Sequence, residues 1–186
     1  DTTDGAVHDD RVIGRHGKGD SIPDDTGNEC EREQQEEQQY MKFTKMQGCG
    51  NDYVYVNGFT EKLSPQEKPE IVRKLSDRHF GIGGDGVIFI NPAEEADFEM
   101  EMYNADGSRS EMCGNGIRCV AKYVYDKGLT DQEDITIVSA GKIKYLKLTV
   151  EGRTATDRGQ VTMVQVNMGQ PVLAPVEVPV IAEATQ

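Results

Sequence analysis

Apolar residues recur with a helical period along one stretch near the middle of the chain. They begin after Cys113 and fall at i, i+3, i+4, i+7 and i+8: Ile117, Val120, Ala121, Val124 and Tyr125. Lys127 and then Gly128 follow the last of them, an order typical of a helix C-terminus. The pattern predicts a largely buried helix that starts just after Cys113.

A second helix is predicted over residues 64–76. Ser64 is a good N-cap, Pro65 suits the first helical position, and Glu67 completes a capping box. Pro69 lacks a backbone N–H, so the start can shift by a few residues. The apolar side chains that would face the core are Ile71, Val72 and Leu75.

Alternating apolar and polar residues indicate short β-strands elsewhere. Phe98, Met100 and Met102 alternate with polar neighbours, which is the period of a half-buried strand. The predicted strands cover residues 42–46, 53–57, 87–91, 98–103, 135–139, 143–150 and 161–167. Many short strands around one apolar helix predict an α+β fold: a curved mixed sheet or barrel wrapped around a central helix.

The N-terminal stretch has a different composition. Residues 1–40 hold 12 acidic and 4 basic residues, with a nearly continuous run of Glu and Gln at 31–39. Such a segment buries too little apolar surface to offset the entropy of ordering. We therefore expect disorder or a frayed helix over residues 1–40.

Charge and composition narrow the functional class. The net charge of -13 disfavours a nucleic-acid partner. The chain has no run of 18 apolar residues, so no membrane span is expected. The acidic head lacks the apolar core of a signal peptide, which makes a cytoplasmic protein the default expectation. The spacings of Cys30, Cys49, Cys113 and Cys119 match no zinc pattern, so no metal is expected.

Cys113 lies where a strand and a run of turn residues give way to the central helix. A helix N-terminus presents free N–H groups and the positive end of the helix dipole, both of which favour an anion. This placement is expected to lower the pKa of the thiol and to make the thiolate available at neutral pH. Gly114 and Gly116 allow close approach to the backbone amides, which suit a carboxylate or phosphate.

Three motifs, occurring in the right order, make the chain resemble the diaminopimelate epimerase family. They are Lys45-Met46-x-Gly48-x-Gly50-Asn51-Asp52, then Asp77-Arg78-His79-Phe80-Gly81-Ile82-Gly83-Gly84-Asp85-Gly86, then Asn104-x-Asp106-Gly107-Ser108 with Cys113-Gly114-Asn115-Gly116-x-Arg118 after it. The resemblance implies two similar lobes, each a strongly curved sheet around a helix, with the site in the cleft between them.

The resemblance also implies an activity. It is the cofactor-independent interconversion of LL- and meso-diaminopimelate, in the lysine and cell-wall precursor pathway. One thiolate removes the α-proton and a thiol on the opposite face returns one, and Cys113 matches one of these two bases. The residues implied to hold the substrate are Asn51, Asn104, Gly114 and Asn115. The partners implied are a small-molecule substrate and, for the full-length enzyme, a second copy in a homodimer.

The family's second cysteine and its distal substrate contacts have no counterpart in these 186 residues. We therefore expect an incomplete fragment, inactive in isolation. Its predicted parts are an acidic extension at 1–40 outside the enzyme, the first lobe at 41–170, and the start of a truncated second lobe at 171–186.

Two further classes of function stay open, a related amino-acid racemase and a non-catalytic protein. A proline or hydroxyproline racemase has a similar layout, but such enzymes tend to carry His after Cys-Gly, where this chain has Asn115. A racemase of another amino acid could use the same scaffold. The alternative from another class is a non-catalytic half-enzyme.

Three features near the motifs carry weaker expectations. The Gly-rich loop at 81–86 runs into a strand rather than a helix, which argues against a dinucleotide-binding fingerprint. Some relatives have a substrate-contacting glutamine where Gly86 stands, so Gly86 is given no binding role. His79 is expected to be structural. Cys49 stands where an apolar residue is usual and is expected to be a small buried hydrophobe.

Overall fold

The computed structural model describes residues 10–14 and 40–171. Its strands and helices are, in chain order, β1 (Asp10–Gly14), β2 (Tyr40–Gly48), β3 (Asn51–Asn57), α2 (Lys68–Ser76), β4 (Gly86–Asn91), β5 (Phe98–Asn104), β6 (Arg109–Ser110), α3 (Gly114–Asp126), β7 (Asp134–Ser139), β8 (Lys142–Glu151) and β9 (Gln160–Val166). Neither helix of this described part is long and apolar enough to span a membrane.

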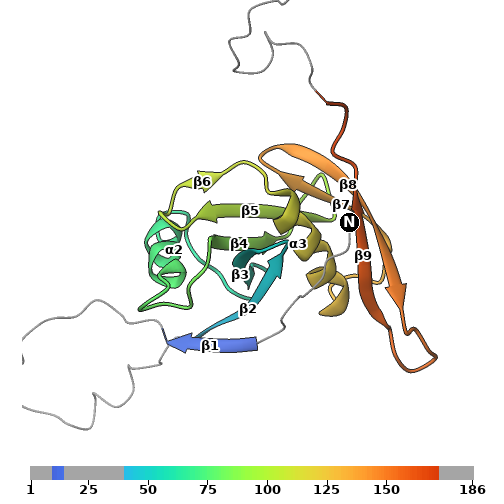
Figure 1. Cartoon of the computed structure of the whole chain (residues 1–186), viewed down its shortest axis with the longest axis horizontal. Helices are drawn as coiled ribbons and strands as arrows, with labels where there is room; N and C mark the ends of the chain where they lie inside the picture. Colours follow the sequence, from blue (N-terminus) through green and yellow to red (C-terminus); the bar gives the residue numbers. More distant parts are fainter. Residues whose placement is uncertain (1–9, 15–39, 172–186) are drawn as a thin grey trace, which may run out of the picture.

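All the strands belong to one mixed sheet. Its order is β1-β2-β3-β4-β5-β7-β8-β9, and the short β6 pairs with β5. The pairs β3–β4 and β5–β7 are parallel, whereas the other neighbours are antiparallel. Parallel neighbours need a crossover connection, and the two helices lie on these connections. Figure 1 shows α3 enclosed by the curl of the sheet, with β8 and β9 passing along one side of it.

The central strands are buried on both faces, with alternate side chains in two separate cores. An inner core surrounds α3 and includes Tyr53, Tyr55, Ile88, Ile90, Met100 and Met102 from β3, β4 and β5. An outer core lies under α2 and includes Val54, Val56, Val87, Phe89 and Tyr103 from the same strands. Because successive side chains of a strand point to opposite faces, alternate residues of these strands pack toward α3 and the others toward α2.

Helix α3 is buried over most of its surface because the sheet curls round it, and its side chains are accordingly mostly apolar. Its buried residues run from Gly116 to Tyr125 almost without interruption and include Ile117, Cys119, Val120 and Ala121. On β8, by contrast, only Leu146 and Leu148 are buried, since that strand has one face toward α3 and one toward solvent. The α+β fold expected from the sequence, a curved mixed sheet around a central helix, is confirmed.

One buried ion pair ties α2 to the sheet. Lys68, the first residue of α2, is paired with Glu101 of β5, and both are more than nine-tenths buried. Burial by itself would raise the pKa of Glu101, but hydrogen bonds from Lys68, Tyr103 and Asn91 outweigh it and hold that pKa below its usual value. Burial, together with the hydrogen bond to the Glu101 carboxylate, raises the pKa of Tyr103 to about 12.

The structure departs from the sequence expectations at three places. Helix α2 begins at Lys68 rather than Ser64, because residues 64–67 form a turn in which the Ser64 carbonyl accepts the Glu67 N–H. The two-residue β6 was not expected. Within the stretch predicted to be disordered or a frayed helix, Asp10–Gly14 is instead a strand paired with β2. Residues 1–9 and 15–39 lie outside the described residues, so the domain division remains a prediction.

Candidate active site

The first turn of α3 is built around Cys113. This residue is the N-cap, with extended backbone, and its Sγ accepts a hydrogen bond from the Gly116 N–H at 3.3 Å. Its carbonyl accepts from the Ile117 N–H at 2.9 Å. The first turn carries no acidic side chain. The half-buried sulfur therefore lies at the positive end of the helix, beside an N–H donor that can stabilise a thiolate.

Two glycines differ in the space around them. A methyl group at Gly116 would lie 2.8 Å from Ile88 Cδ1 and 3.4 Å from Cys113 Cβ, so the helix start packs directly on β4. At Gly114 the nearest atom would be Arg118 Nη1, at 3.9 Å. The N–H groups of Gly114 and Asn115 are the first two of α3 and have no acceptor within the helix. The side of the turn that carries Gly114 is thus the open one.

Asn115 and Asn51 contact each other although 64 residues separate them. Asn115 Nδ2 donates to Asn51 Oδ1 at 2.6 Å, and Arg118 Nη2 donates to Asn115 Oδ1 at 2.5 Å. The turn between β2 and β3 comes close to α3 because Gly48 has no side chain, and a methyl there would lie 3.2 Å from the Asn115 carbonyl oxygen. The structure therefore brings Asn51, Gly114 and Asn115 to the helix end that Cys113 caps.

A group of charged residues supports Asn51 from the far side. Asp85 Oδ2 accepts from Asn51 Nδ2 and from the Asp52 N–H, both at 3.2 Å. Arg78 bridges Asp85 and Asp52, with Nη2 at 2.9 Å and 2.7 Å from their carboxylates, and Lys45 lies 3.0 Å from Asp52. The hydrogen bond from Arg78 outweighs burial and lowers the pKa of Asp52 to about 2.

Asn104, the fourth residue expected to hold substrate, is placed differently. It ends β5 opposite Gly86 of β4. Its Nδ2 donates to Ser108 Oγ at 3.0 Å, and its backbone N–H donates to the Ser108 carbonyl. Its side chain is therefore engaged in the turn that follows β5, not in the Asn51–Asn115 pair.

Two tyrosines of β3 lie near Cys113 and Cys119, and no sequence motif singles them out. Burial, and then the proximity of Cys113, raises the pKa of Tyr53, which is only 5% exposed. Tyr55 lies near Cys119, and burial raises the pKa of both groups. The one local signal is the alternation of Tyr53 and Tyr55 with valines, which places both rings on the α3 side of β3.

Cys49 contradicts the sequence expectation. It is exposed, not a buried hydrophobe, and it adopts a positive φ of 52° at the tip of the β2–β3 turn. A tight turn there needs left-handed backbone, which points this side chain to the surface rather than into a core. Its Sγ lies 3.5 Å from Arg118 Nη2, at the edge of the candidate site.

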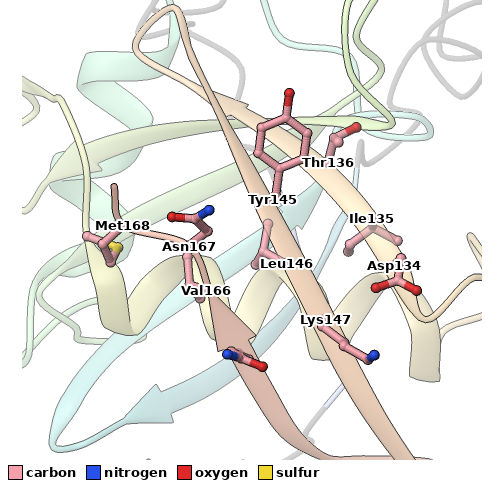
Figure 2. Close-up of a pocket in the computed structure, with 10 residues that line it drawn as sticks. Asp134, Ile135, Thr136, Tyr145, Leu146, Lys147, Val166, Asn167 and Met168 are labelled. Carbon is pink, nitrogen blue, oxygen red and sulfur yellow. The ribbon is translucent and has the colours of Figure 1, made fainter. Parts of the chain in front are cut away.

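A cavity of about 540 Å³ lies elsewhere on the molecule. Figure 2 shows it over β7, β8 and β9, lined by residues that include Asp134, Tyr145, Lys147, Asn167 and Met168. None of the residues around Cys113 lines it. Within the described residues, no group of His, Cys, Asp and Glu could hold a metal ion.

Two solved structures share this fold. A methylitaconate-delta-isomerase covers 68% of this chain and 41% of its own length, at 13% identity and a TM-score of 0.54. A hydroxyproline epimerase from Agrobacterium vitis covers 89% of this chain and 47% of its own, at 14% identity and a TM-score of 0.52. At these identities the likeness establishes the fold alone.

The family is established by sequence. The family model for diaminopimelate epimerase matches residues 43–173. The chain is 57% identical over 141 residues to a diaminopimelate epimerase of Agathobacter rectalis. These residues make up 76% of this chain and 47% of the relative. It is 52% identical over 144 residues to one of Methanococcus maripaludis, at 77% and 49% coverage. The chain belongs to the diaminopimelate epimerase family, and it spans about half the length of the curated relatives it matches.

Proposed function

We propose that this chain supplies one half of the active site of an isomerase that interconverts LL- and meso-diaminopimelate without a cofactor. The observation that carries the proposal is the first turn of α3. There Cys113 caps a helix N-terminus that has no acidic side chain of its own, next to the paired amides of Asn51 and Asn115. The activity would serve lysine and cell-wall precursor synthesis.

Cys113 is proposed as one of two bases. Its thiolate takes the proton from the α-carbon, and the electron pair of the broken C–H bond is left on the carbon and spreads into the substrate carboxylate. A thiol on the opposite face then gives a proton to that carbon, which inverts the centre and leaves the second sulfur as thiolate. The two sulfurs exchange protonation states, so each turnover in one direction prepares the enzyme for the reverse direction.

The substrate carboxylate is proposed to lie against the N–H groups of Gly114 and Asn115. Charge that develops on this carboxylate during proton removal would be stabilised by these donors and by the helix dipole. Asn51 would hold a neighbouring polar group of the substrate. Asn104 would contribute only if its bond to Ser108 gives way when substrate binds.

The second base is not identified among the described residues. Tyr53 of β3 is buried, and its pKa, raised by burial and by Cys113, makes it a poor proton donor and leaves almost no phenolate to act as a base. We therefore propose that the opposite thiol and the contacts to the distal amino-acid centre come from a second lobe. On this proposal the 186-residue chain alone does not epimerise diaminopimelate.

The test compares this chain with a version extended through a second lobe. Conversion of LL- to meso-diaminopimelate is followed by chiral chromatography, and α-proton exchange in deuterated water by NMR. The extended protein should convert substrate, and Cys113→Ala should abolish the conversion. Cys30→Ala is the matched control, since it removes a thiol outside the family match at 43–173.

Either of two results would overturn the proposal. One is robust epimerisation by residues 41–186 alone, because a single identified base cannot invert the centre efficiently. The other is an extended Cys113→Ala protein that still converts substrate at the rate of the Cys30→Ala control.

A further inference from the structure

Four side chains form an unbroken line of hydrogen bonds across the candidate site. Arg118 Nη2 donates to Asn115 Oδ1 at 2.5 Å, and Asn115 Nδ2 donates to Asn51 Oδ1 at 2.6 Å. Asn51 Nδ2 donates in turn to Asp85 Oδ2 at 3.2 Å. The line starts on α3, crosses the β2–β3 turn and ends in the Gly-rich loop at 81–86, whose role the sequence left open.

The two ends of this line fix the orientation of both amides. A guanidinium can only donate and a carboxylate can only accept, whereas an amide can be turned either way. If Asn115 were turned over, its NH2 group would face the donors of Arg118. If Asn51 were turned over, its oxygen would face the Asp85 carboxylate. Arg118 and Asp85 therefore allow one arrangement in which every neighbour is complementary.

Asp85 is itself held in place. Its second oxygen accepts from Arg78 Nη2 at 2.9 Å, and the oxygen facing Asn51 also accepts the Asp52 N–H at 3.2 Å. Its backbone carbonyl accepts the Ala105 N–H and its N–H donates to the Asp52 carbonyl, which ties the loop to the strands on either side. The carboxylate is thus a rigid acceptor and not a mobile surface charge.

We infer that Asp85 is a positioning residue, which together with Arg118 orients the Asn51 and Asn115 amides toward substrate. Each amide uses one N–H and one oxygen lone pair within the line, which leaves one N–H and one lone pair for a ligand. A fixed pair of this kind can donate to a carboxylate and accept from an ammonium, the two charged groups of an α-amino acid. This inference rests on the proposed function, because it assigns the amides a substrate to hold.

The first test does not depend on activity. Asp85→Asn keeps the shape but replaces one acceptor oxygen by a donor NH2. That group must then oppose either Arg78 or the donors of Asn51 and Asp52. The side-chain NH2 signals of Asn51 and Asn115 in the ¹⁵N-labelled chain should shift in this variant. They should stay in place in Asp131→Asn, the same change at an exposed partner of Arg158. Unmoved signals in Asp85→Asn would overturn the inference.

The second test is a double-mutant cycle on kcat/KM in the protein extended through a second lobe. Asp85→Asn should lower kcat/KM for diaminopimelate about tenfold, the factor that goes with one hydrogen bond. In an Asn51→Ala background the same change should have almost no further effect. An equal loss in both backgrounds would mean a general structural role and would overturn the inference.

The two tests separate the inference from the proposed function. Shifted amide signals with an unchanged kcat/KM would keep the orientation of the amides but refute the positioning role. Absence of epimerisation in the extended wild-type protein would refute the proposed function, and the NMR result would still decide whether Asp85 orients the two amides.

Discussion

The two helices begin in opposite ways. At the start of α2 the Glu67 carboxylate accepts from both the N–H and the hydroxyl of Ser64, and Glu70 lies in the first turn. The first residue of α2, Lys68, is buried in an ion pair with Glu101. At the start of α3 the cap is a sulfur, the first turn holds no acid, and the Asn115 amide of that turn is bonded to Asn51.

The difference shows what each end is for. Glu67 and Glu70 place two carboxylates of the chain itself near the positive end of α2, so its start is a structural anchor on the outer face of the sheet. The positive end of α3 has no such partner in its first turn, and the groups gathered there are a thiol and two oriented amides. A helix end that is not neutralised by its own side chains is suited to an anion supplied from outside.

The largest expected change in stability is at the α2 end. Lys68→Met leaves the Glu101 carboxylate buried without its main partner and should lower the free energy of unfolding by about 3–5 kcal/mol. Lys74→Met is the matched control, since Lys74 pairs with Glu70 on the exposed side of α2 and should matter little. Urea unfolding measures both. Equal losses in the two variants would show that the buried pair is not an anchor.

A carboxylate placed in the first turn of α3, like those at the start of α2, should reduce activity much more than it changes the free energy of unfolding. Asn115→Asp places a carboxylate in the first turn, where the helix dipole favours it but a substrate carboxylate does not. Epimerisation by the extended protein should fall by about 100-fold or more, while the free energy of unfolding stays within about 1 kcal/mol of the parent's. Activity within a few-fold of the parent's would contradict the anion site.

The glycines of the same turn should respond unequally to a methyl group. Gly116→Ala forces the new carbon against Ile88 and should destabilise the chain by about 1–3 kcal/mol. Gly114→Ala meets nothing closer than 3.9 Å and should be neutral or slightly stabilising. Thermal unfolding of the two variants makes the comparison, and a Gly114→Ala variant that loses as much stability as Gly116→Ala would mean that this side is not open.

The smallest expected effect is the pH dependence that Asp52 adds through its bonds with Arg78 and Lys45. Its pKa is about 2 in the folded chain against the usual 3.8, so the unfolded chain takes up the proton more readily. The stability that Asp52 contributes is therefore complete above about pH 4 and is lost as the pH falls toward about 2. Urea midpoints at pH 5 and pH 3 should differ less in Asp52→Asn than in the parent. An identical difference would rule out this contribution.

Local patterns predicted the helices and strands well. The spacing from Ile117 to Tyr125 gave α3 almost to the residue, and Gly128 has the positive φ of 77° expected just past a helix end. The start of α2 moved to Lys68 because Pro69 fits the first turn of a helix but not its interior. β6 is too short to show a period in the sequence.

The candidate site was only partly predictable. The motifs pointed to Cys113, Asn51 and Asn115, but the line from Arg118 to Asp85 joins segments 34 and 64 residues apart, and no local pattern encodes such contacts. The expectation that Cys49 is buried was wrong, because turn geometry, not its apolar character, decides where its side chain points. The roles of Cys113, Asn51, Asn104, Gly114 and Asn115 remain proposals.

The most direct test of the central claim is the alkylation rate of each thiol at pH 7. Iodoacetamide labelling of the folded chain and of the urea-unfolded chain, read by mass spectrometry, gives a folded-to-unfolded ratio for Cys113 and for Cys119. The helix N-terminus should make Cys113 react faster folded than unfolded. Cys119, 1% exposed and with its pKa raised by burial, should be protected. A Cys113 that reacts more slowly when folded, or no faster than Cys119, would contradict the account.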